Sequence, residues 1–83
     1  MNILFHCTFE NSNEWKRKLK KKFRNKNIIS IYDKSKFDKV DIAIIWNLPK
    51  QILKKLPNLK IIFSLGAGVD HILKLDDYNG TPI

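Results

Sequence analysis

Residues Leu59 to Leu73 read LKIIFSLGAGVDHIL, and this stretch decides the fold. An apolar strand predicted over 59–65 runs directly into a loop with two glycines, Gly66 and Gly68, and the first turns of a helix are predicted from Asp70 to Leu75. A strand, a tight turn and a helix in this order are typical of α/β proteins, in which ligands bind beyond the carboxyl ends of the strands. The segment therefore predicts a fold class and a place to look for a site.

Three more short apolar segments precede this stretch, and helical patterns lie between them. The strands are apolar without strict alternation, so they belong inside a parallel sheet with helices on both sides. We expect a flavodoxin-like α/β fold over one domain, residues 1–83, with a mostly parallel four-stranded sheet of order 2-1-3-4. The predicted elements are strands at Asn2–His6, Asn27–Tyr32 and Asp41–Trp46, a surface helix at about Asn13–Asn25, a charged connection at Asp33–Lys39, a short helix from Pro49 to Leu56, and Thr81–Ile83 as a segment that could begin a fifth strand.

Length and composition bound the functions that this chain can carry. Its 83 residues are 43% hydrophobic and 29% charged, which describes one small folded domain. An enzyme with both a cofactor site and a substrate site normally needs about two or three times this length, so we expect a module or a piece that leans on a partner. The single cysteine, Cys7, cannot close an internal disulfide. No membrane span and no signal-peptide pattern is visible, so we expect a cytoplasmic protein.

The net charge of +8 comes from one element. Eight Lys and Arg residues lie within residues 16–26, on the helix whose apolar stripe is Trp15, Leu19 and Phe23. One hypothesis is therefore a basic module that binds nucleic acid or an anionic surface through this helix. Against it, the lysines surround the helix and no nucleic-acid-binding motif is present. A solvated lysine-rich surface explains the charge, and we expect no specific nucleic-acid partner.

The loop Gly66-Ala67-Gly68 is the candidate site. Successive backbone N–H groups at the start of a helix can bind a carboxylate or phosphate, although a tight turn without a ligand is an equal alternative. The loop is not a dinucleotide fingerprint, because His71 stands where the third glycine would be. Trp46, at the end of the neighbouring strand, could line the same crevice or fill the rim of the core.

Catalytic roles for the nearby titratable residues are disfavoured. Asp70 is expected to cap the helix that begins there, and His71 to fill a half-buried helix position. His6 and Cys7 are adjacent on a strand and point to opposite faces, so they would not meet as a base and a nucleophile. We expect Cys7 to be a buried structural thiol.

These segments together resemble the D-isomer-specific 2-hydroxyacid dehydrogenases, and within them the glyoxylate/hydroxypyruvate reductase A type. The resemblance covers essentially the whole chain and keeps the order and spacing of four segments. It rests on residues 59–73, on the start MNILF with Thr8 and Phe9, on Trp15 at the head of the first helix, and on Ile44-Ile45-Trp46 followed by Pro49.

The resemblance implies that this chain is the N-terminal part of a flavodoxin-like substrate domain. The enzyme would reduce a small 2-keto acid such as glyoxylate or hydroxypyruvate with NADPH or NADH. By the same resemblance, the N–H groups of Ala67 and Gly68 hold the substrate carboxylate. Leu65 and Gly66 shape the approach, and Trp46 forms a wall.

The family's dinucleotide fingerprint and its catalytic Arg, Glu and His would all follow Ile83. We therefore expect no catalytic residue, no metal and no bound cofactor in this chain alone. The resemblance implies a Rossmann domain and a homodimer in the complete enzyme. A stand-alone flavodoxin-like module that binds a small anion at the glycine loop shares the fold and stays as a third alternative.

Overall fold

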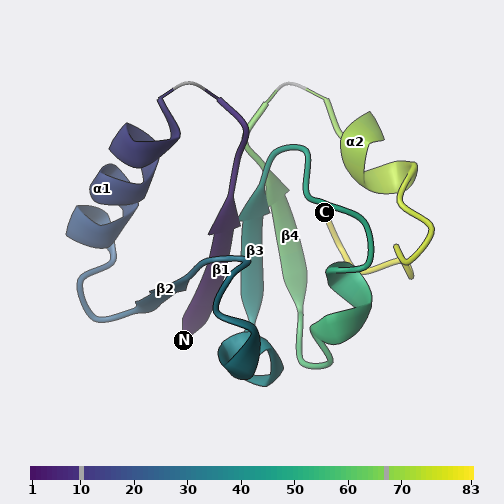
Figure 1. The fold of residues 1–83 in the computed structure, drawn as a ribbon, viewed down its shortest axis with the longest axis horizontal. Coiled ribbons are helices and arrows are strands. Elements are labelled where there is room, and N and C mark those ends of the chain that lie inside the picture. The colour runs from purple at the N-terminus through teal and green to yellow at the C-terminus, as the bar shows by residue number, and fades with distance from the viewer. Residues whose placement is uncertain (10, 67) are drawn as a thin grey trace.

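The computed structural model describes residues 1–9, 11–66 and 68–83 and contains a four-stranded sheet with helical segments on both sides (Figure 1). The strand order is β2-β1-β3-β4, and each neighbouring pair is parallel. The predicted α/β class and the predicted order are therefore confirmed. The strands are β1 (Asn2–His6), β2 (Asn27–Ile29), β3 (Ile42–Ile45) and β4 (Ile61–Ser64).

The main core lies on one face of this sheet. Side chains alternate between the faces along a strand, and the register aligns Leu4 with Ala43 and Ala43 with Ile62. These three residues therefore share a face, and each is 0% exposed. The helical segments η1 (Lys34–Lys39), η2 (Leu53–Lys55) and α2 (Asp70–Leu73) cover this face. Their contributions to the core, with those of the adjoining loops, are Phe37, Val40, Leu48, Ile52, Leu53, Leu56, Ile72 and Leu75.

The opposite face is only half covered. Helix α1 (Ser12–Lys22) crosses from β1 to β2, and none of its residues is fully buried. A single helix, about 10 Å wide, covers about two strands spaced about 4.8 Å apart, so it cannot cover four. Over β4, Phe63 is 50% exposed. The uncovered area contains a mainly apolar groove of about 380 Å³, which is lined by Trp15, Lys18, Leu19, Lys22, Phe23, Ile44 and Phe63.

Two predicted segments differ from the structure. The charged connection at 33–39 contains η1, because Phe37 and Val40 are both buried in the core and the backbone must turn to place them there. The helix predicted from Pro49 to Leu56 is reduced to η2, because Gln51 has a φ of 72°, which interrupts a right-handed helix.

The ends of other elements also differ. Strand β2 stops at Ile29, α1 ends at Lys22, and α2 ends at Leu73. The segment 81–83 forms no strand, although the N–H of Ile62 donates to the carbonyl of Pro82 at 2.8 Å and places the C-terminal residues beside β4. No helix in the described part of the chain has the length and apolar character needed to cross a bilayer.

Candidate functional site

The glycine loop joins β4 to α2 at the carboxyl edge of the sheet, next to the end of β3 (Figure 1). Hydrogen bonding continues one residue past the strands here. The N–H of Leu65 donates to the carbonyl of Ile45 at 3.1 Å, and the N–H of Trp46 donates to the carbonyl of His6 at 2.9 Å. Of the predicted substrate-binding residues, Trp46, Leu65, Gly66 and Gly68 are described, and Ala67 lies outside the described residues.

Gly66 is in close contact with the indole of Trp46. A Cβ atom added to Gly66 would lie 2.2 Å from Cζ3 and 2.6 Å from Cη2 of that ring, far inside van der Waals contact. The ring also lies 5.4 Å from the ring of Phe9, centroid to centroid. The expectation that Trp46 and the glycine loop share one region is confirmed as geometry. Position 66 is glycine because the Trp46 ring occupies the place of a side chain.

Gly68 has different surroundings. It is exposed, and a Cβ atom added there would meet no heavy atom within 4 Å. Its φ is not among the positive values, so the backbone does not require glycine. Within the described residues, no hydrogen bond uses the N–H of Gly66 or Gly68. The space beside the backbone of Gly68 is therefore open.

A directional hydrogen-bond chain, here called the His71 chain, ties the two loops together. The N–H of Asn47 donates to Nδ1 of His71 at 3.2 Å, which fixes Nδ1 as an acceptor and puts the proton of the neutral ring on Nε2. Nε2 lies 2.9 Å from Oγ of Ser64, and that hydroxyl donates to the carbonyl of Gly68 at 2.8 Å. The His71 chain therefore fixes the end of β3 against the glycine loop.

His71 is buried, with 6% of its surface exposed, and its ring centroid lies 4.3 Å from that of Trp46. Burial lowers the pKa of His71 below the usual 6.5, which favours the neutral form that the His71 chain needs. Both ring nitrogens are engaged by protein groups, so His71 has a structural role. The expected capping by Asp70 is wrong, because the cap position is Val69 and no side-chain cap bond forms.

Two other titratable residues lie at this edge of the sheet, Cys7 and His6. Cys7 is a buried free thiol, as expected. His6 is half-buried, and burial lowers its pKa. No group of three or more metal-ligating side chains occurs in the part of the chain that the structure describes.

Sequence reasoning missed Asn47 and Ser64. Ser64 shares a face of β4 with the buried Ile62, so it is a polar residue that points toward the core. A polar residue at such a position needs a hydrogen-bond partner, and the sequence pattern could have indicated this. Asn47 has a φ of 55°, a conformation that asparagine tolerates better than most residues. The direction of its N–H toward His71 follows only from the folded geometry.

Comparison with known proteins was made in sequence and in structure. No family profile matches the chain. The glyoxylate/hydroxypyruvate reductase A of Serratia proteamaculans is 34% identical over 82 residues, which are 98% of this chain and 26% of the relative. That of Yersinia enterocolitica is also 34% identical, over 73 residues, which are 88% of this chain and 23% of the relative.

A solved structure of a probable 2-hydroxyacid dehydrogenase from Rhizobium etli, in complex with NADP, HEPES and L(+)-tartaric acid, superposes with a TM-score of 0.78 at 30% identity. The match covers 99% of this chain and 27% of that one. The chain thus spans about a quarter of the length of its relatives. Both comparisons confirm the resemblance drawn from the sequence.

Proposed function

Because this chain is related in sequence and fold to one segment of the D-isomer-specific 2-hydroxyacid dehydrogenases, we propose that it is the N-terminal part of the substrate domain of an NAD(P)H-dependent 2-keto acid reductase. The names of its relatives favour glyoxylate and hydroxypyruvate as substrates and glycolate and glycerate as products. The complete enzyme would be a cytoplasmic homodimer with a Rossmann domain.

The observation that carries this proposal is the contrast between the two glycines. The ring of Trp46 occupies the space where a side chain at position 66 would lie. Gly68 instead faces open space at the carboxyl edge of a parallel sheet, where α/β proteins bind ligands. Backbone N–H groups at such a turn attract a carboxylate because several partial positive charges converge. We assign the N–H groups of Gly68 and of Ala67 to the substrate carboxylate.

Trp46 would form a fixed wall beside that carboxylate. Its ring is held between Phe9 and His71, and the His71 chain locks the carbonyl of Gly68. A group held in place before binding costs less entropy when the ligand arrives, so this support favours a defined substrate pose. Leu65, paired to the end of β3, would border the approach.

The chemistry of reduction needs more than this loop. A hydride must reach the keto carbon, a proton must reach the keto oxygen, and a cation must polarise the substrate. The nicotinamide cofactor supplies the hydride when it is bound, and the glycine loop does not fit a dinucleotide because His71 fills the third glycine position. This chain would bind and orient the carboxylate, and the remaining groups would come from the rest of the enzyme.

The half-covered face of the sheet supports the proposal that the complete enzyme contains further chain that packs against it. A parallel sheet is normally covered on both faces, and here Phe63 and the apolar groove are open. Relatives about four times as long contain enough additional chain to cover this face.

The test is steady-state kinetics on the complete reading frame, identified by sequencing past the codon for Ile83. Gly68→Val should raise the KM for the keto acid at least about tenfold, because the side chain fills the ligand's space, and should leave the KM for NADPH unchanged. Gly68→Ala is the control for a smaller side chain at the same position. Loss of cofactor binding with an unchanged keto-acid KM would show that the loop serves another ligand.

The 83-residue chain by itself should not oxidise NADPH in the presence of glyoxylate. Its turnover can be followed by the loss of absorbance of the reduced nicotinamide. Measurable turnover would refute the assignment as a part of a larger enzyme.

A further inference from the structure

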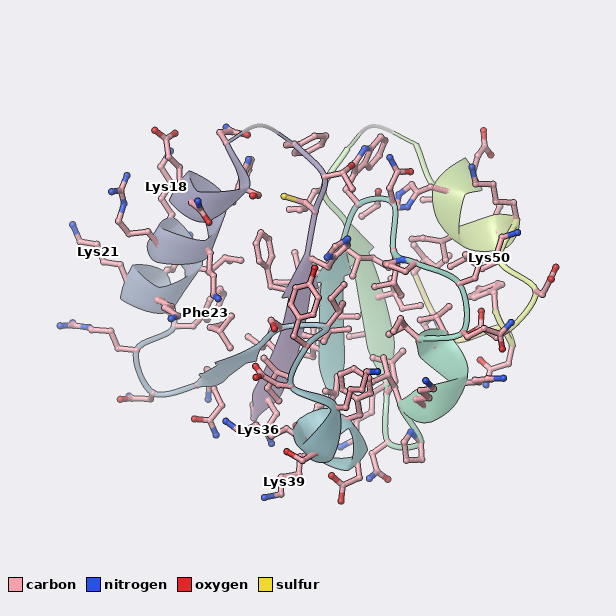
Figure 2. All side chains as sticks on the ribbon, in the orientation of Figure 1. Lys18, Lys21, Phe23, Lys36, Lys39 and Lys50 are labelled. Carbon is pink, nitrogen blue, oxygen red and sulfur yellow. The ribbon has the colours of Figure 1, made fainter. Side chains whose placement is uncertain are left out.

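A second concave site lies at the opposite edge of the sheet, where β1 and β2 begin. It is a pocket of about 420 Å³ between the end of α1, the start of β2 and η1. The strands are parallel, so this amino edge is the one remote from the glycine loop. Figure 2 shows Lys36 and Lys39 extending from η1. The pocket, here called the basic pocket, is lined by Asn2, Lys20, Arg24, Lys26, Asn27, Ile28, Ile29, Lys36 and Lys39.

Five cationic side chains surround the basic pocket, and among the described residues no carboxylate lines it. Two acidic residues close in the fold accept hydrogen bonds from backbone N–H groups, and one of them binds the lining residue Asn2. Asp33 accepts from the N–H of Ser30 at 3.0 Å, and Asp41 accepts from the N–H of Asn2 at 2.9 Å. The five positive charges of the lining outnumber the charges of these two carboxylates, so the pocket keeps a positive excess that a bound anion would reduce.

Helix electrostatics explain only part of this arrangement. Lys20 lies in the last turn of α1, where a cation stabilises the helix dipole, and Arg24 follows just after the end of that helix. Lys36 and Lys39 lie likewise in the last turn of η1, but the dipole of each helix does not explain why residues from different parts of the chain meet at the same pocket. The convergence of three segments on one concavity is what distinguishes the basic pocket from the other lysines of α1.

We propose that the basic pocket binds a small polyvalent phosphate, either inorganic polyphosphate or the phosphate tail of a nucleotide. One monovalent anion cannot neutralise five cations, whereas a chain of phosphates can. The volume lies in the range of about 300–1,000 Å³ in which proteins bind small ligands. Asn2 accepts from Nδ2 of Asn27 at 2.9 Å through Oδ1, which leaves the NH2 group of Asn2 as a donor.

A nucleic-acid strand fits the basic pocket less well. Single-strand binding sites combine a groove that follows the backbone with aromatic side chains that stack on the bases. No aromatic residue lines the basic pocket within the described chain. The recognisable chemistry is phosphate alone.

The experiment is calorimetric titration of the 83-residue chain with tripolyphosphate at a constant ionic strength of about 0.15 M, where exposed charges are screened beyond about 8 Å. The double variant Lys36→Glu/Lys39→Glu should weaken binding at least about tenfold, because it puts two negative charges into the pocket. The matched control is Lys21→Glu/Lys50→Glu, which changes the net charge equally. Both control positions are exposed and outside the pocket (Figure 2), so the control should weaken binding less than about threefold.

Further arms identify the source of the phosphate. Equal affinities for tripolyphosphate and adenosine triphosphate would support a site for the phosphate tail alone, and tighter binding of the nucleotide would support a nucleotide ligand. Amide resonances of Asn2 and Asn27 in the wild-type chain should shift on titration, a readout that does not depend on whether a variant folds. Three outcomes would each overturn the proposal. The two double variants could lose affinity for tripolyphosphate equally, the Asn2 and Asn27 resonances could stay unshifted, or the chain could bind an oligonucleotide that tripolyphosphate does not displace.

Discussion

Replacing Gly66 by alanine tests whether the Trp46 ring defines the glycine loop. The new Cβ would lie 2.2–2.7 Å from three ring carbons, whereas ordinary contact begins at 3.4 Å, so the ring must move by about 1 Å. The ring cannot move freely, because Phe9 and His71 pack against it. Overpacking of this kind typically costs about 1–3 kcal/mol. For a domain of this size, that loss lowers the melting temperature by about 4–24 °C.

The assay is thermal and urea unfolding of the 83-residue chain, followed by circular dichroism. Gly68→Ala is the matched control, since its Cβ meets nothing within 4 Å and should change the free energy of unfolding by less than about 0.5 kcal/mol. In a Trp46→Ala background, the cost of Gly66→Ala should disappear, which a double-mutant cycle measures. Equal costs at the two glycines, or a cost that persists without the Trp46 ring, would refute the reasoning.

Two other predictions concern pH and the two faces of the sheet. Burial lowers the pKa of His71 and His6 below 6.5 in the folded chain, so the unfolded chain takes up protons first on acidification. The free energy of unfolding should therefore fall as the pH drops below about 6.5. Unfolding curves measured across this pH range should show a smaller fall in the variant His71→Gln. An unchanged fall would exclude His71 as a source of the pH dependence. Ile62→Ala should lower the free energy of unfolding by about 2–5 kcal/mol, because Ile62 is 0% exposed. Phe63→Ala should lower it by less than about 1.5 kcal/mol, because Phe63 lies on the other face and is 50% exposed. Similar losses for the two variants in urea unfolding would contradict the half-covered sheet.

Much of the fold could be predicted because hydrophobic patterning and turn residues act locally. The run from Leu59 to Leu65 followed by Gly66 and Gly68 indicated a strand and a turn, and the parallel order followed from strands that are apolar on both faces. The extent of the helix predicted from Pro49 to Leu56 was wrong because Gln51 has a positive φ, and the sequence has no glycine at that position to signal it.

The candidate site was predictable in position and less so in mechanism. Trp46 and the glycine loop were expected to be neighbours because adjacent parallel strands end at the same edge. The separate roles of Gly66 and Gly68 depend on where the Trp46 ring lies, which no spacing in the sequence states. The His71 chain depends likewise on a backbone N–H that points across from another strand.

The central claim is that the backbone N–H groups of Ala67 and Gly68 receive the carboxylate of a 2-keto acid. The most direct measurement is a nuclear magnetic resonance titration of the 15N-labelled chain with oxamate, an unreactive analogue of a 2-keto acid. Our account predicts weak, saturable shifts at the amides of Ala67 and Gly68. It predicts no such shifts in Gly68→Val, because the valine side chain would occupy the open space beside Gly68 that the ligand needs. Saturable shifts confined to other residues, such as Asn27 in the basic pocket, or a titration unaltered by Gly68→Val, would contradict it.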